Sequence, residues 1–262
     1  MLKKGDLKVE KNKTDESVNS VIAILLPTYC EAENIGNLIR TIENLGIKAK
    51  IIVIDDSSPD GTGKVVKKLQ KKYRNITLLT RSFKAGLGTA ITYGFRFVLS
   101  QQNPPGYIIT MDADYSHDPK EIPKLLHQAE RGYDIVVGSR YCLGGTVKGW
   151  PLIRLAISKI ANKITAKLVS LPINDFTSGF RCYSRTYIQK ILPNLHSQTY
   201  EIQIETLRQA YVYNARVSEV PITFTNRKKG KSKLTKNEIL SFVLYILKTA
   251  LRNLKIATFK VC

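Results

Sequence analysis

The stretch Tyr107-Ile108-Ile109-Thr110-Met111-Asp112-Ala113-Asp114 decides the fold of this chain. Its apolar first part predicts a buried strand over Tyr107–Met111. Asp112 and Asp114 follow directly, at the edge of the sheet where ligands collect in open α/β folds. Two carboxylates so close together repel each other, and a divalent cation with oxygen ligands relieves that repulsion. Because Asp-x-Asp also occurs in solvated loops, the pair indicates a metal site only together with the motifs around it.

Apolar runs and helical patterns alternate on both sides of this strand. Strands are predicted at Val21–Leu26, Ile51–Ile54, Ile76–Leu79 and Ile135–Val137. Apolar residues at helical spacing predict helices over 35–45, 65–73, 88–99 and 122–129. This alternation predicts an α/β fold, with a mostly parallel, Rossmann-like central sheet and helices on both faces.

The pattern changes after Arg140. Glycines at 144, 145 and 149 predict a loop, and Leu152–Leu171 predicts a basic amphipathic helix. A functional loop over Asn174–Tyr183, a helix over Tyr200–Tyr211 and an edge strand over Ala215–Val220 follow. We expect a disordered tail over 1–19, one catalytic domain over 20–236 and a C-terminal helix over 237–262.

The charge of the chain is unusually positive. Its 262 residues include 41 Lys or Arg against 21 Asp or Glu, a net charge of +20. From Asn226 to Cys262 there are ten basic residues and a single acid, Glu238. Polyanions, anionic membranes and phosphorylated substrates are the partners that such a balance favours. A nucleic-acid-binding protein is a competing interpretation, but no known binding module or stripe of interleaved aromatic and basic residues supports it.

Cysteines and termini indicate the cell compartment. Cys30, Cys142, Cys182 and Cys262 form no CxxC pair, which is typical of reduced cytosolic thiols rather than a disulfide framework or zinc site. The polar N-terminus lacks the apolar core of a signal peptide. No run approaches the ~20 apolar residues that cross a membrane. We therefore expect a cytoplasmic protein without a membrane span.

Polar motifs also follow the first two predicted strands. Pro27-Thr28-Tyr29-Cys30-Glu31 suits a base and ribose site, or a turn that caps a helix. In the segment 54–62, Asp56 can accept a hydrogen bond from a nucleobase, although turn and capping roles would also explain its polar residues. Arg81 and the segment Lys84–Gly88 suit a loop that faces a diphosphate, or a solvated loop.

Taken in order, these motifs resemble one family. Together with Gly138-Ser139-Arg140-Tyr141, Thr177-Ser178-Gly179-Phe180-Arg181 and the segment 226–234, they resemble the inverting family 2 glycosyltransferases of GT-A fold. Within that family they are most similar to the dolichyl-phosphate (polyprenyl-phosphate) β-mannosyltransferases. The resemblance covers about Val21 to Ser241.

The resemblance implies a role for each matching residue. Asp112, Asp114 and Ser116 would bind Mg²⁺ or Mn²⁺, with Gln in some relatives where this chain has Ser116. Asp112, Asp114 and Arg140 would be catalytic. Arg154 would supplement the residues that bind phosphate. The donor and phosphate site would comprise Pro27, Tyr29, Glu31, Ile54, Asp56, Asp112, Ala113, Asp114, Arg140, Arg227 and Lys233.

The chain departs from the family pattern at two positions. Cys30 stands where the first motif usually has Asn. Lys231 replaces the acid of the usual Gly-Glu-Ser-Lys, which makes this loop more basic and could alter acceptor preference.

By this resemblance, the expected reaction transfers mannose from GDP-mannose to dolichyl or polyprenyl phosphate with inversion. A phosphate monoester, with its second pKa of about 6, is largely ionised at pH 7 and can attack C1 without a general base. We accordingly expect structural roles for His117 and Glu205. A polyprenyl-phosphate glucosyltransferase that uses UDP-glucose is the alternative enzyme, because Asp56 could serve either base.

The C-terminal segment begins with a capping-box pattern, Thr235-Lys236-Asn237-Glu238. An apolar run over 239–247 and basic residues from Lys248 to Lys260 follow. This pattern is too short to span a membrane but suits a helix at an anionic membrane surface. It equally suits a helix packed on the domain or on a partner subunit. We expect peripheral attachment to the cytoplasmic membrane face (of the endoplasmic reticulum in a eukaryote), with a membrane-anchoring accessory subunit as a further candidate partner.

Overall fold

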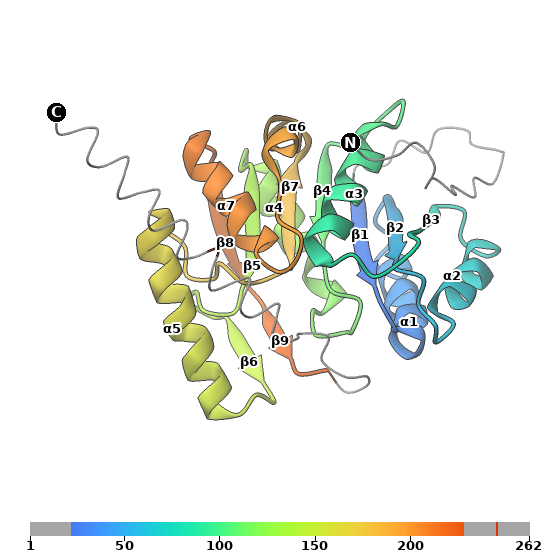
Figure 1. Cartoon of the computed structure of the whole chain (residues 1–262), viewed down its shortest axis with the longest axis horizontal. Helices are drawn as coiled ribbons and strands as arrows, with labels where there is room; N and C mark the ends of the chain where they lie inside the picture. The colour runs from blue at the N-terminus through green and yellow to red at the C-terminus, as the bar shows by residue number, and fades with distance from the viewer. Residues whose placement is uncertain (1–21, 228–244, 246–262) are drawn as a thin grey trace.

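A central sheet with helices on both faces forms the fold of the computed structural model, which describes residues 22–227 and Tyr245 (Figure 1). The strand order is β3-β2-β1-β4-β7-β5-β8. Only β7 runs antiparallel to its neighbours in this sheet, so the predicted mostly parallel arrangement is confirmed. The strands are β1 Ile22–Thr28, β2 Ala49–Asp55, β3 Ile76–Thr80, β4 Tyr107–Thr110, β5 Ile135–Ser139, β7 Arg181–Ser184 and β8 Val217–Pro221.

Strand β1 shows why the apolar runs form strands here. Ile22, Ile24 and Leu26 face one layer of the core. Ala23 and Leu25 face the other layer, and all five side chains are fully buried. Because both faces of the sheet are covered, the strand is apolar at successive positions instead of alternating with polar residues.

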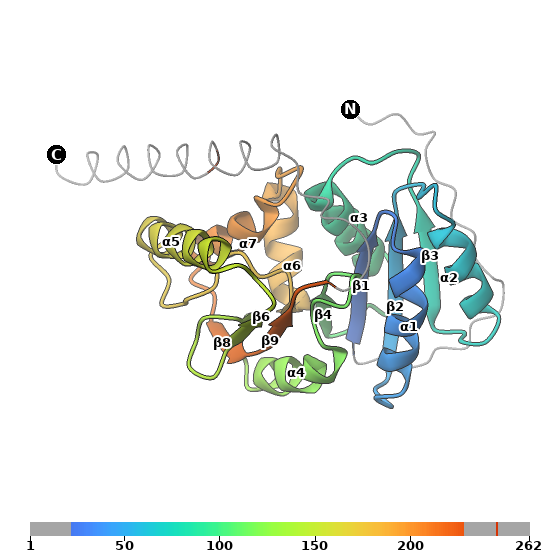
Figure 2. The same ribbon diagram turned by 90° about the horizontal axis from the view of Figure 1, so that it is seen from below.

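Two layers of helices cover the sheet (Figure 2). One layer contains α1 Ala32–Glu43, α2 Thr62–Gln70 and α4 Ile122–Glu130. The other contains α3 Leu87–Leu99, α6 Arg185–Ile191 and α7 Ile202–Val212. Helix α5, Leu152–Val169, packs against α7 at one end of the molecule. Two short 3-10 turns, Pro119–Glu121 and Leu192–Asn194, precede α4 and follow α6.

The second half of the chain differs most from the prediction. The expected loop 174–183 ends in β7, which inserts between β4 and β5. The glycine-rich segment contains the short strand β6, Thr146–Lys148, which pairs with β9, Thr223–Thr225. Neither short strand has an apolar pattern that would predict it from the sequence. Both form through their pairing with each other, which is a tertiary contact. Strand β8 lies at the sheet edge, as predicted.

Several predictions fall on residues outside the described ranges. These are the disordered tail over 1–19, most of the C-terminal helix over 237–262, and Lys233. Within the ranges that the structure does describe, no helix is long and apolar enough to cross a membrane.

Candidate active site

The carboxyl ends of β1, β2 and β4 border one cavity. Among the predicted site residues, Ile54 does not line this cavity: it is fully buried, in the core cluster that also contains Leu25 and Ala90. Lys84, Leu87 and Tyr200 also line the cavity, although Leu87 and Tyr200 had no assigned role. The predicted residues on its wall are Pro27, Tyr29, Glu31, Asp56, Asp112, Ala113, Asp114 and Arg227. The fold therefore brings together most of the predicted donor site.

Asp112 and Asp114 lie in the turn after β4. Asp114 is nearly buried: one carboxylate oxygen accepts the Ser116 N–H at 3.0 Å, and the other lies 2.9 Å from the Arg227 guanidinium. Asp112 opens to the cavity, with 40% of its side chain exposed. Desolvation raises the pKa of Asp112, and the nearby carboxylate of Asp114 adds to the rise against the opposing charge of the Arg227 guanidinium. Negative charge at this position calls for a cation.

The residues of this turn fit a hard divalent cation. Ser116 Oγ is buried and has no hydrogen-bond partner in the part of the chain that the structure describes. It follows two carboxylates on the same turn, and all three groups present oxygen, the ligand type that Mg²⁺ and Mn²⁺ prefer. No group of three or more His, Cys, Asp or Glu that could hold a metal occurs among the described residues. Such a site would need further oxygen ligands from water or a diphosphate.

The His117 side chain holds the backbone of this turn in place. Its Nδ1 accepts a hydrogen bond from the Asp112 N–H at 3.2 Å, and its ring stacks on Phe180 with centroids 5.2 Å apart. Burial lowers the pKa of His117, so the ring is neutral and Nδ1 can accept. The neighbouring Asp118 caps the following 3-10 turn through the Lys120 N–H. His117 thus fixes the backbone of Asp112 instead of facing the cavity.

Asp56 is engaged by a neighbouring loop. Arg81 donates to both of its carboxylate oxygens at 2.6 Å, and the Ala85 N–H donates at 3.2 Å. This clamp holds the segment Lys84–Gly86 at the cavity, where the Lys84 ammonium lies 5.2 Å from the Tyr29 ring centroid. Asp56 therefore shapes the wall of the cavity, and Arg81 occupies much of its hydrogen-bonding capacity.

The glycines of this loop have a packing role. A Cβ on Gly86 would lie 2.4 Å from the carbonyl oxygen of Gln198, and one on Gly88 would lie 2.4 Å from that of Ser197. Glu205 accepts hydrogen bonds from the N–H groups of His196 and Ser197, which holds this crossing segment in place. Close approach of two backbones therefore explains these glycines without a diphosphate.

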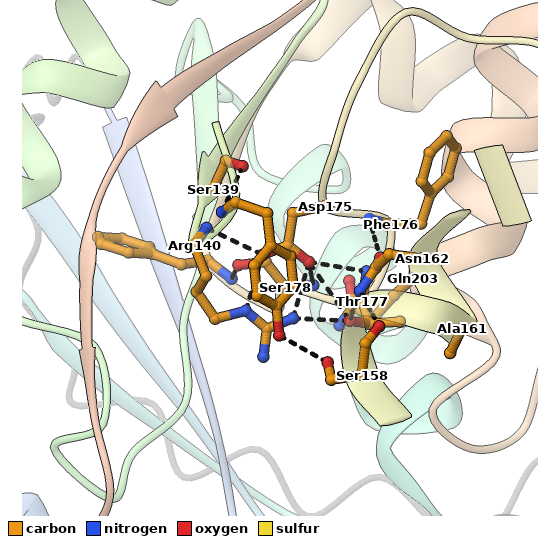
Figure 3. A network of polar contacts seen from close by, with 12 residues as sticks. Ser139, Arg140, Ser158, Ala161, Asn162, Asp175, Phe176, Thr177, Ser178 and Gln203 are labelled. Carbon is orange, nitrogen blue, oxygen red and sulfur yellow. Dashed lines mark hydrogen bonds and ion pairs between the residues drawn. The ribbon is translucent and has the colours of Figure 1, made fainter. Parts of the chain in front are cut away.

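Arg140 lies apart from the cavity wall, in a network of polar contacts (Figure 3). Its guanidinium donates to both carboxylate oxygens of Asp175 at 2.7 Å, and to Thr177 at 2.6 Å. Asp175 is fully buried and also accepts N–H groups from Arg140 and Ser178. Although burial alone would raise the pKa of Asp175, the Arg140 guanidinium holds it below its usual range. The predicted catalytic and phosphate-binding roles of Arg140 stay predictions.

Asp175 is the residue that the sequence reasoning missed. It lies within the segment 174–183, which was predicted to be a functional loop, but no role was assigned to its carboxylate. A signal existed, because a lone acid in a segment rich in Thr, Ser and Gly needs a basic partner when it is buried. The identity of that partner, 35 residues away, could not be read from the sequence.

Comparison with known proteins identifies the class. Residues 23–192 match the family model of glycosyl transferase family 2. The chain belongs to this family of glycosyltransferases, and its fold is the GT-A fold.

Two relatives are similar over most of their length. Polyprenol monophosphomannose synthase of Mycolicibacterium smegmatis is 39% identical over 220 residues, which cover 82% of each chain. Undecaprenyl-phosphate mannosyltransferase of Micrococcus luteus is 34% identical over 217 residues, covering 82% of this chain and 87% of the relative.

A solved structure shows the same fold. Glucosyl-3-phosphoglycerate synthase from Mycobacterium tuberculosis, in complex with Mn²⁺, UDP and glucosyl-3-phosphoglycerate, superposes with a TM-score of 0.64. The match covers 89% of this chain and 79% of that one, at 17% identity. At this identity the likeness concerns the fold alone.

Proposed function

We propose that this protein transfers mannose from GDP-mannose to a polyprenyl phosphate, dolichyl phosphate included, and inverts the anomeric centre to form a β-mannosyl phospholipid. The observation that carries this proposal is the Asp112–Asp114 pair, which shares one cavity with Arg227 at the carboxyl ends of the parallel strands. Support comes from the two relatives. One is named a polyprenol monophosphomannose synthase, and the other an undecaprenyl-phosphate mannosyltransferase.

The donor would lie along the wall formed by the β1 and β2 ends. The nucleoside would contact Pro27, Tyr29 and Glu31, on the same cavity as Ala113. The diphosphate would then lie toward the turn after β4, where Asp112, Asp114 and Ser116 would hold Mg²⁺ or Mn²⁺. That ion would offset the charge that grows on the departing diphosphate.

Arg227 is suited to bind a phosphate at this point. In the structure its guanidinium pairs with Asp114, at 2.9 Å. If Asp114 bound a divalent cation, the guanidinium would be able to turn to a phosphate group, two oxygens of which Arg can bind at once. Arg154 would contribute positive charge beside it, and the same role is proposed for Lys233.

The chemistry needs no base from the protein. An oxygen of the acceptor phosphate forms a bond to C1 of mannose, while the bond from C1 to the diphosphate oxygen breaks and its electron pair leaves with GDP. The acceptor is already ionised at pH 7, since its second pKa is about 6. His117 Nδ1 accepts from the Asp112 backbone and Glu205 from two backbone N–H groups, which is consistent with a reaction that uses neither as a base.

A transfer assay tests the proposal. Purified protein with Mn²⁺ or Mg²⁺ should transfer labelled mannose from GDP-mannose to a short polyprenyl phosphate, and NMR should show the β anomer. UDP-glucose in a parallel assay should give little product. Glucose transfer without mannose transfer would contradict the proposed donor and favour the glucosyltransferase. Metal chelation should abolish turnover.

The lipid acceptor places the reaction at a membrane. We propose peripheral attachment at the cytoplasmic face, supported by the net charge of +20 and by the excess of basic residues after Asn226. An accessory membrane-anchoring subunit remains a further proposed partner. Binding to DNA that persists at physiological salt would instead favour the nucleic-acid interpretation.

A further inference from the structure

Helix α5 carries an apolar stripe on its outer face. Ile153, Ile157, Ile160 and Ile164 are spaced four, three and four residues apart and are 72%, 62%, 57% and 49% exposed. At ~100° per residue they fall within about 60° of arc, and thus form one continuous strip. Leu152, 84% exposed, lies beside the strip in the first turn of the helix. We call these five side chains the α5 stripe.

The inner face of the same helix combines polar side chains with Val169, which is buried in the core. Asn162 and Thr165 are buried against the domain. Asn162 accepts the Phe176 N–H at 2.7 Å and donates to Thr177 at 3.2 Å (Figure 3). Ser158 accepts from the Tyr141 hydroxyl at 2.7 Å. A helix on the surface of a water-soluble domain normally has the opposite polarity. These directional contacts fix the rotation of α5, so its apolar side must face outward.

Charge around the α5 stripe favours a membrane over a second copy of the chain. Lys159, Lys163 and Lys167 are exposed along one side of the stripe. Between residues 140 and 167 there are six basic residues and no acid. A second copy packed on this face would bring like charges together in a region of low dielectric, whereas anionic lipid headgroups complement them.

The N-terminal end of α5 lies close to the active site. The Arg154 guanidinium lies 4.0 Å from the Trp150 ring centroid, and Trp150 packs edge-on against Phe224 at 5.3 Å. Phe224 in turn contacts His117, the residue that holds the Asp112 backbone. A continuous set of contacts through Trp150, Phe224 and His117 thus links the N-terminal end of α5 to the acidic pair.

We propose that the α5 stripe inserts into the surface of an anionic membrane, with Lys159, Lys163 and Lys167 on the lipid phosphates. The helix then lies flat in the headgroup region with its polar face on the catalytic domain. This orientation holds the active site beside the membrane, where a lipid-linked phosphate can reach it while its chain stays in the bilayer. The last step rests on the proposed function, because it assumes a lipid acceptor.

Vesicle binding by the full chain tests this surface. The double variant Ile157→Asn/Ile160→Asn should bind vesicles of phosphatidylcholine and phosphatidylglycerol at least tenfold more weakly than the unchanged protein. Tyr211→Asn/Val212→Asn on α7 is the matched control, because those side chains are 58% and 59% exposed. The control should change binding less than twofold. Lys159→Gln/Lys163→Gln should weaken binding to the anionic vesicles more than to vesicles of phosphatidylcholine alone.

Three results would overturn the proposal. The α5 variant could bind vesicles as the unchanged protein does. It could instead lose a dimer in sedimentation, which would assign the α5 stripe to a second copy. It could also melt at a lower temperature with unchanged vesicle binding, which would assign the stripe to contacts within the chain.

The binding assay contains no sugar donor, so its outcome is independent of the proposed function. The α5 variant could lose vesicle binding while the unchanged protein transfers no mannose to polyprenyl phosphate. That result would contradict the proposed function and still support the membrane-binding surface. If both proposals hold, the α5 variant should show a raised KM for an acceptor embedded in vesicles. Its kcat with a short soluble acceptor should be unchanged.

Discussion

The two halves of the molecule build the site in different ways. Before Arg140, each polar group follows directly from the end of a parallel strand, as Asp56 follows β2 and Asp112 follows β4. After Arg140, a side-chain network shapes the region: Asp175 binds Arg140 across 35 residues, and Asn162 on α5 supports the same loop. The contrast teaches that strand ends position the groups predicted to act on the donor, whereas buried polar contacts hold the region beside the proposed acceptor.

Asp114→Asn gives the largest expected effect on activity in the first half. Loss of one carboxylate at the acidic pair should lower kcat by about 10²–10³, the range seen when a group that stabilises developing charge is removed. Without metal, the melting temperature should stay nearly unchanged, since Asn can still accept the Ser116 N–H. Full activity of this variant would remove Asp114 from the catalytic site.

Asp175→Asn should act on stability in the second half. It leaves the buried Arg140 guanidinium without its carboxylate, and loss of one partner of a buried pair costs about 3–5 kcal/mol. Denaturant unfolding should show this loss in the free energy of unfolding. An unfolding free energy equal to that of the unchanged protein would mean that the Arg140 network is not needed to support this half.

The same pair predicts a pH dependence. Because the native pKa of Asp175 lies below the usual 3.8, its contribution to stability is present above that value and is lost as the pH falls through the native pKa. The unfolding free energy of the unchanged protein should therefore decrease more steeply below pH 3.8 than that of Asp175→Asn. Parallel profiles for the two proteins would argue against the assigned direction of the shift.

Arg227→Ala tests where the two halves meet. Loss of one charge-assisted contact costs about 1.5–3 kcal/mol, roughly a ten- to hundredfold loss of transfer. GDP binding, measured by calorimetry with Mn²⁺, should change little if Arg227 serves the acceptor phosphate. Lost GDP binding with normal acceptor saturation would instead assign Arg227 to the donor.

Cys30→Asn should give the smallest effect, and it concerns only the half of the molecule before Arg140. Cys30 adopts a left-handed backbone with φ of 57°, a conformation that Asn tolerates better than most residues. The substitution should stabilise the fold by at most about 1 kcal/mol, the lower end of the cost of a left-handed residue, and leave transfer unchanged. A clear loss of transfer in this variant would show that the thiol position contacts the donor.

The sequence by itself determined the sheet and the polar strand ends. The apolar runs of β1, β2 and β4 have few alternatives to a strand buried on both faces, and residues that follow parallel strands must meet at one edge. The motifs in order were also enough to indicate the family. These features depend on neighbours in the chain, so local patterns encode them.

Only the tertiary structure decided the rest. The antiparallel insertion of β7, the Arg140–Asp175 pair and the close approach behind Gly86 join segments that are far apart in the sequence. The amphipathic pattern of α5 was visible in the sequence, but not which side faces the domain. Its polar side is bound there because the buried Phe176 N–H needs an acceptor and Asn162 on this helix supplies it, a requirement that exists only once the chain has folded.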